Sequence, residues 1–180
     1  MSAATDLLLD GFSRVQGTVH SVVHDLGADG LGFRPGGTSN SVAWLVWHLT
    51  RVQDDHVAGV AGTEQVWTAQ GWVGRFGLPL PEDDTGYGHD DGAVGALGSV
   101  GSDLLSGYHD AVHAATAAYL STLQDADFDR IVDRSWDPPV TLGVRLVSVL
   151  DDDAQHAGQA AYVRGLFERG GAASSDEDST

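Results

Sequence analysis

The sequence contains no cysteine and no lysine, and these two absences narrow its chemistry. Without cysteine the chain has no disulfide, no thiolate metal ligand and no thiol nucleophile of its own. All 9 basic residues are arginines, and 26 acidic residues bring the formal net charge to −17. So acidic a chain offers no basic face for phosphate groups, so we expect neither nucleic acid nor a membrane as partner. The 8 histidines and the carboxylates are then the available metal ligands.

Long apolar runs are also missing. No stretch approaches the roughly 20 residues that a membrane helix needs, and the N-terminus lacks the basic start of a secretory signal. The expected location is therefore the cytoplasm. With 180 residues, 42% of them hydrophobic, the chain is long enough to bury one core. We expect one domain over residues 1–168 and a disordered acidic tail over 169–180.

Four segments repeat apolar residues at the spacing of an amphipathic helix. They are residues 4–26, 41–61, 90–124 and 140–168. Glycines weaken the first half of the third segment, so its helix could begin as late as Ser102. Residues 62–89 are too irregular for a long helix and too aromatic for a flexible linker, which indicates an ordered crossover. The pattern predicts an all-α four-helix bundle with a long crossover between helices 2 and 3.

Polar residues on the second and fourth predicted helices face the expected core. Asp152 and His156 are four positions apart, about 40° around the helix axis, and therefore share a face. His48 lies at one edge of the buried stripe of the second helix and can also point inward. Together the three side chains would make a metal site with open coordination positions. The alternative, which spacing alone favours, is that they are ordinary core histidines and a nearby carboxylate.

Four stretches of the sequence resemble an actinobacterial branch of the DinB-like superfamily, over roughly residues 5–168. They are W-x-x-W-H-L-T-R-V-x-D-D-H, G-W-x-x-R-F-G-L-P, Y-G-H and D-P-P-V-T-L-G-V-R-L-V-S-V-x-D-D-x-x-Q-H-A-G-Q. The resemblance implies a four-helix bundle that holds a divalent metal at His48, Asp152 and His156. Many members of that family carry His, and the mycothiol-dependent isomerase branch carries Glu, where this chain has the shorter Asp152. Asp153, about 40° from the centre of the buried stripe against about 60° for Asp152, is therefore a second candidate ligand.

The same resemblance implies an enzyme that uses the metal with a low-molecular-weight thiol. We expect an S-transferase or a thiol-dependent isomerase with a small-molecule substrate and a mycothiol-type cosubstrate, because the chain has no thiol of its own. Zinc is the expected metal, with nickel or another transition metal as the alternative. A metal-dependent hydrolase and a non-catalytic small-molecule-binding bundle remain open. Proteins of this family commonly dimerise, so a homodimer is a further candidate, although no spare apolar stripe stands out.

Three more polar residues are candidates for the catalytic site. Arg145, two turns before Asp152, would either anchor an anionic substrate or neutralise that carboxylate. Asp55 would bond the second nitrogen of a ligand histidine, and Gln159 would orient a ligand or bind substrate. For Asp55 and Gln159 the alternative is an exposed side chain. His56 lies about 12 Å along the helix from His48, too far to share an ion.

Aromatic residues and the remaining histidines carry weaker expectations. Tyr87 and His89 would either cover the mouth of the metal site or close the crossover. His109 and His113 are expected at a solvent-exposed edge of the third helix. The tryptophans are expected mainly to pack in the core, with a substrate cleft as the alternative. They are Trp44, Trp47, Trp67, Trp72 and Trp136.

Overall fold

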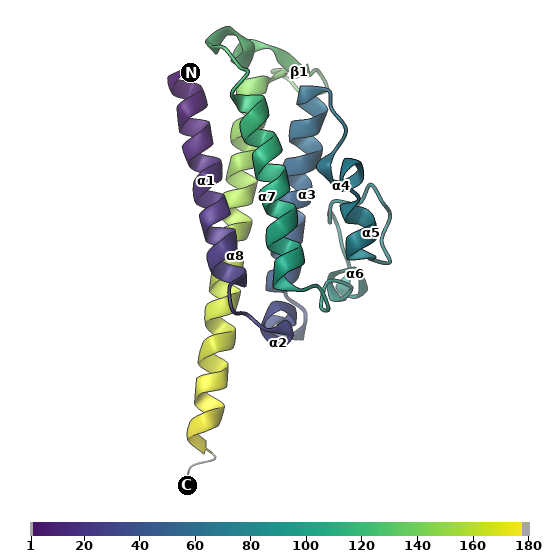
Figure 1. Ribbon diagram of the computed structural model, residues 1–180, viewed down its shortest axis with the longest axis vertical. Coiled ribbons are helices and arrows are strands. Elements are labelled where there is room, and N and C mark those ends of the chain that lie inside the picture. Colours follow the sequence, from purple (N-terminus) through teal and green to yellow (C-terminus); the bar gives the residue numbers. More distant parts are fainter. Residues whose placement is uncertain (1, 178–180) are drawn as a thin grey trace.

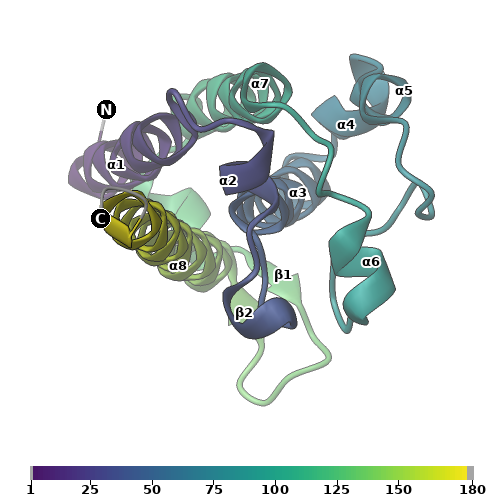
Figure 2. The ribbon, with the colours of Figure 1, turned by 90° about the horizontal axis from the view of Figure 1, so that it is seen from below.

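The computed structural model describes residues 2–177, and the side chains as far as Gly170. Within that range, four long helices pack along one another (Figure 1). They are α1 (Ala3–Val23), α3 (Val42–Ala61), α7 (Ser102–Leu120) and α8 (Leu142–Glu177). Seen end-on, they occupy the corners of a square in the order α1, α7, α3, α8 (Figure 2). The predicted four-helix bundle is confirmed.

Shorter elements connect these helices. They are α2 (Ala28–Gly32), η1 (Pro35–Gly37), α4 (Val66–Ala69), α5 (Trp72–Phe76), α6 (Asp91–Gly95), η2 (Asp125–Asp129), β1 (Ile131–Asp133) and β2 (Val140–Thr141). The predicted crossover is therefore ordered, and it contains α4 and α5. The third long helix begins only at Ser102, because the glycine-rich segment before it forms the separate turn α6.

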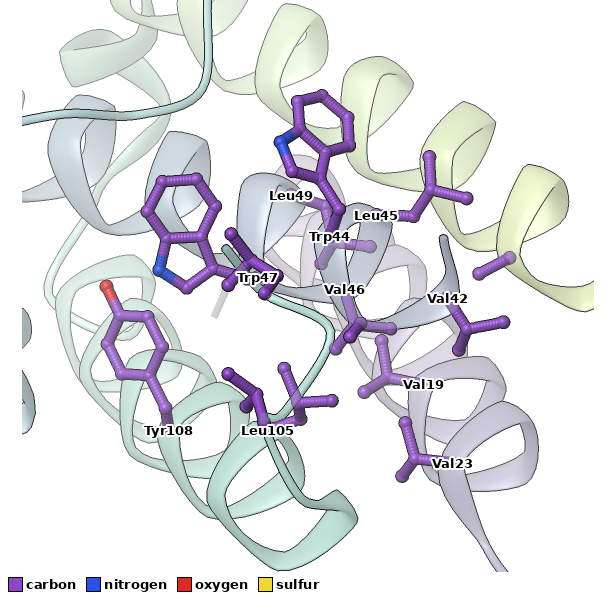
Figure 3. Packing of buried hydrophobic residues seen from close by; sticks show 14 of the residues in the cluster. Val19, Val23, Val42, Trp44, Leu45, Val46, Trp47, Leu49, Leu105 and Tyr108 are labelled. Carbon is purple, nitrogen blue, oxygen red and sulfur yellow. The ribbon is translucent and has the colours of Figure 1, made fainter. Parts of the chain in front are cut away.

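Helix α3 has the most buried surroundings of the bundle. Ser41 begins it by accepting a hydrogen bond from the amide of Trp44 at 3.2 Å, and Gly62 ends it in the left-handed conformation at φ 70°. Every residue from Val42 to Asp54 is buried, because α7, α8 and the crossover cover the helix on different sides. Its apolar residues interlock with Val19 and Val23 of α1 and with Leu105 of α7 (Figure 3). Polar side chains that α3 carries are therefore held in fixed positions.

The antiparallel β1–β2 hairpin was not predicted. Ile131 pairs with Thr141 and Asp133 with Val140, and the pair is too short to show an alternating pattern in the sequence. The amide of Leu142 donates to the carbonyl of Arg130 at 2.8 Å, which fixes the hairpin to the start of α8. Its loop projects beside α3 and α8 (Figure 2).

Helix α8 continues to Glu177, past residue 168, where the sequence placed the end of the bundle. Residues 178–180 of the expected tail lie outside the described residues. None of the helices in the described part of the chain combines the length and the apolar character needed to cross a membrane.

Candidate metal centre

Two neighbouring antiparallel helices bring three predicted residues together. His48 comes from α3, and Asp152 and His156 come from α8. One potential ligand atom from each of them lies within 4.8 Å of the other two. The two imidazole rings stand edge to face, with centroids 4.7 Å apart. Asp153 is not part of this cluster, and its side chain is completely buried in the bundle.

The hydrogen bonds of both histidines leave one ring nitrogen of each available. Nδ1 of His48 bonds to the carbonyl of Thr85, and Nδ1 of His156 bonds to the carbonyl of Asp152 at 2.9 Å. Since a carbonyl only accepts, each neutral ring carries its proton on Nδ1 and its lone pair on Nε2. Within the described residues, neither Nε2 atom makes a hydrogen bond. This is the arrangement that main-chain carbonyls impose on metal-binding histidines.

The carboxylate of Asp152 completes a donor set that fits a metal ion. Its Oδ2 atom is buried and lies 3.3 Å from Nδ1 of His156, within ion-pair range but without hydrogen-bond geometry. A buried carboxylate oxygen without a hydrogen bond is costly unless a cation faces it. Two imidazole nitrogens and one carboxylate oxygen are the donors that zinc and similar ions accept.

The electrostatics of the cluster favour the protonation states that metal binding needs at His48 and Asp152, whereas at His156 the metal competes with a proton. Burial lowers the pKa of His48, which keeps its ring neutral at pH 7. Burial acts to raise the pKa of Asp152, but the contact with His156 and the nearby imidazoles outweigh it and lower that pKa. The Asp152 side chain raises the pKa of His156 against the effect of burial. The carboxylate is therefore ionised, and a cation is favoured beside it.

The loop at residues 84–89 holds His48 in place from outside the bundle. Gly86 has a φ of +97°, and a Cβ atom there would lie 2.7 Å from Nδ1 of His48. The glycine lets the loop approach closely enough to present the Thr85 carbonyl. Trp44 stacks on His48 with ring centroids 4.6 Å apart and 15° between the planes. Tyr87 lies edge-on to the same ring, with centroids 5.7 Å apart, and lines a cavity together with Asp152.

Arg51 fixes this loop from within the core. Its side chain is fully buried, and its Nε donates to the carbonyl of Asp84 at 3.0 Å. Its Nη1 donates to Gln65 at 2.8 Å and to the hydroxyl of Tyr108 at 3.2 Å. Sequence reasoning missed Arg51, Thr85 and Gly86. The arginine of the W-H-L-T-R motif and the glycine of T-G-Y-G-H were visible signals, but a main-chain carbonyl has none.

Arg145, Asp55 and Gln159 lie around the cluster but do not bond to it. Arg145 donates to Oδ2 of Asp133 at 3.1 Å and to Nδ1 of His56 at 2.9 Å, so it does not neutralise Asp152 as one alternative held. Asp55 accepts from Gln65 at 2.7 Å, and the Thr85 carbonyl occupies the place predicted for it beside His48. Gln159 is exposed and lines a different cavity, one turn beyond His156.

Two expectations outside the cluster need correction. His109 is fully buried and bonded to Thr50, because α7 packs against both α1 and α3 and so buries a wider face than a simple stripe. Trp136 is 67% exposed on the hairpin loop, unlike the other tryptophans, which are buried as predicted.

Comparison with known proteins decides the family. The profile of the mycothiol-S-transferases (MST) matches residues 7–168, most of the chain. The protein belongs to the mycothiol-S-transferase family. The fold is also similar to the crystal structure of a conserved protein from Enterococcus faecalis, with a TM-score of 0.85 and 30% identity over 92% of this chain and 97% of that one. Among proteins with curated functions, none matches the sequence.

Membership of the mycothiol-S-transferase family confirms the predicted class of enzyme. It implies a mycothiol-dependent S-transferase, with mycothiol as cosubstrate and a small molecule as the other substrate. The predicted resemblance to DinB-like proteins is confirmed with it. The His48, Asp152 and His156 cluster is a candidate metal site of this enzyme.

Proposed function

We propose that the protein joins the sulfur of mycothiol to an electrophilic small molecule, with a zinc ion held by His48, Asp152 and His156. The observation that carries the proposal is the orientation of the two rings. Both Nδ1 atoms bond to main-chain carbonyls, which leaves an Nε2 lone pair on each ring, and one potential ligand atom of each ring and of Asp152 lies within 4.8 Å of the others. An ordinary pair of core histidines would not need this arrangement around an unbonded carboxylate.

A divalent ion with an open coordination position supplies Lewis acidity, which lowers the pKa of a thiol towards neutrality. In the reaction, a sulfur lone pair forms the new bond to carbon, the broken bond's electron pair departs with the leaving group, and the thiol proton passes to water. The chain's own residues orient the reactants. We assign substrate contact to Arg145 and Asp55, which line adjoining cavities beside the cluster, and to Gln159 on its other side.

The metal content of purified variants tests the ligand assignment. His48→Ala and His156→Ala should each lose the bound metal, and Asp152→Ala should weaken its binding strongly, because three ligands are few to begin with. His24→Ala is the matched control, since the His24 side chain is 76% exposed and distant in sequence from all three. Full metal occupancy in His48→Ala or His156→Ala would show that the residue is not a ligand. The same measurement identifies the metal as zinc, nickel or another ion.

A conjugation assay tests the reaction. We expect mycothiol-dependent product formation that a chelator abolishes and added zinc restores. Hydrolysis of the substrate without any thiol would favour the hydrolase alternative, in which hydroxide replaces the thiolate. Inertness toward every thiol, with metal bound, would favour a small-molecule-binding protein instead.

A further inference from the structure

Two neighbouring cavities beside the metal cluster have three lining side chains in common. The first, of about 420 Å³, reaches Asp152 and Tyr87. The second, of about 490 Å³, is lined by residues of the β1 strand and by Arg130 and Asp55. Both are lined by His56, Asp133 and Arg145. We call these two cavities together the hairpin groove.

The charges of the hairpin groove balance. Apart from Asp152, which is assigned to the metal, its charged groups are two carboxylates, Asp55 and Asp133, and two guanidinium groups, Arg130 and Arg145. Burial and the nearby Arg145 lower the pKa of His56, so its ring adds no charge at neutral pH. Such a surface selects neither an anion nor a cation, but it offers many hydrogen-bond donors and acceptors in fixed positions.

Several of these polar groups have bonding capacity left. Arg130 uses Nη2 for the carbonyl of Val60 at 3.0 Å and the hydroxyl of Tyr119 at 2.9 Å, and in the described residues its Nε and Nη1 have no hydrogen-bond partner. Arg145 donates a hydrogen bond to Nδ1 of His56, so that nitrogen carries no proton. The proton of the neutral ring is therefore on Nε2, which can donate it to a ligand. Hydroxyl groups, which donate and accept at once, match this mixture.

The rim of the groove carries an aromatic side chain without a ring partner. Trp136 is 67% exposed on the hairpin loop, and among the described residues no other ring packs on it. An exposed indole next to planar polar side chains is a platform for the apolar face of a sugar ring. Near Asp152 the walls are apolar instead, with Val52, Val140 and Val149.

We propose that the hairpin groove binds the neutral sugar part of the thiol cosubstrate, with its cysteine end beside Asp152 and its sugar and polyol rings running past Trp136 towards Arg130. This rests on the proposed function above. Mycothiol is an acylated cysteine attached to a glucosaminyl-inositol, a neutral group rich in hydroxyls. The cavity on the other side of the cluster, near Leu45 and Tyr162, has no charged side chain in its lining and fits the polyol less well.

Kinetics with two thiols separate the sugar contacts from the metal site. Trp136→Ala should raise the KM for mycothiol about tenfold and leave the KM for N-acetylcysteine, which lacks the sugar part, unchanged. Leu7→Ala, at a 73% exposed residue of α1, is the matched control. An equal change in the KM for both thiols in Trp136→Ala, or an unchanged KM for mycothiol, would overturn the proposal. So would a rise in the mycothiol KM in Tyr162→Ala instead.

Calorimetry of the metal-free protein tests the groove when activity is absent. N-acetylglucosaminyl-inositol, which lacks the cysteine but keeps the uncharged amide, should bind the wild-type protein and bind Trp136→Ala about tenfold more weakly. Binding of this probe in a protein that shows no thiol conjugation would refute the proposed reaction but support the groove. Failure of the probe to bind, in a protein that conjugates mycothiol, would refute the groove alone.

Discussion

The main-chain carbonyl of Thr85 accepts the Nδ1 proton of His48, although the two residues are 37 positions apart in the sequence. The contact exists because Gly86, at a φ of +97°, brings the backbone of the loop close to Nδ1 of the imidazole. It fixes both the tautomer and the orientation of the ring, so the metal affinity of the cluster depends on a loop that contributes no ligand.

Gly86→Ala should therefore damage the metal site from outside it. The new Cβ atom would lie 2.7 Å from Nδ1 of His48 and 3.1 Å from the ring of Trp44, and the backbone would be strained. We expect metal affinity to fall about 10- to 100-fold and the free energy of unfolding to fall by about 1–3 kcal/mol. Titration with zinc and urea unfolding measure the two effects.

Gly88→Ala provides the matched control. Gly88 also has a positive φ, of +72°, but a Cβ atom there would meet nothing within 4 Å. The Gly88→Ala variant should lose stability through backbone strain and keep the metal affinity of the wild type. Equal metal affinity in the two variants would contradict the role given to the contact between the loop and His48.

Arg51→Lys tests whether the buried arginine positions the same loop. Lysine keeps the positive charge near Asp54, whose carboxylate lies 3.7 Å from the guanidinium, but it cannot reproduce the fork that also bonds the Asp84 carbonyl. We expect a folded protein with roughly tenfold weaker metal binding. Arg75→Lys is the control, because Arg51 and Arg75 both lie over a tryptophan ring, Trp67 and Trp72, but Arg75 is exposed. Unchanged zinc affinity in Arg51→Lys would rule out this positioning role.

The four-helix bundle could be predicted from the sequence because the spacing of apolar residues indicates directly which helix faces are buried. It was less informative about Asp152 and Asp153. A helical wheel places Asp153 nearer the centre of the stripe, and the structure indeed buries it completely. A site between two adjacent helices is formed by residues at the edge that faces the neighbour, and Asp152 lies on that edge, towards His48.

Features made by the backbone could not be predicted in this way. The Thr85 carbonyl has no signature in the residue types, and the hairpin that carries Trp136 has strands too short to alternate. His109 was misjudged because α7 is buried against two helices, so residues at the edge of one stripe lie in the centre of another.

Asp153→Leu should stabilise the protein at neutral pH. Both carboxyl oxygens of Asp153 are buried without a hydrogen bond, and burial, then the charge of Asp152, raise its pKa well above the usual value of 3.8. Between 3.8 and the raised pKa the folded state binds more protons than the unfolded state, so wild-type stability falls as the pH rises. Leucine carries no buried charge, so the variant does not lose stability in this way. We expect its free energy of unfolding to exceed that of the wild type by about 1–4 kcal/mol at pH 7.

Urea unfolding of the metal-free protein at pH 7 and below about pH 3 checks this result. The gain in Asp153→Leu should shrink at the acidic pH, where the wild-type carboxyl is protonated in both states. Asp151→Leu, at an exposed neighbouring acid, should stay within about 0.5 kcal/mol of the wild type. A destabilised Asp153→Leu at pH 7 would mean that the carboxyl has a partner that the leucine removes.

His109→Gln should make the protein more resistant to acid. Burial lowers the pKa of His109 from 6.5 to about 3, so the ring stays neutral in the folded state while the unfolded chain takes up a proton. The unfolded state therefore binds more protons between these values, and wild-type stability falls as the pH drops from 6.5 towards 3, by at most about 5 kcal/mol. Glutamine does not titrate, so the free energies of unfolding of the two proteins should converge or cross as the pH falls.

His24→Gln, at an exposed histidine, should follow the wild-type curve. Parallel curves for wild type and His109→Gln across this pH range would show that the buried ring is protonated in the folded state as readily as in the unfolded one.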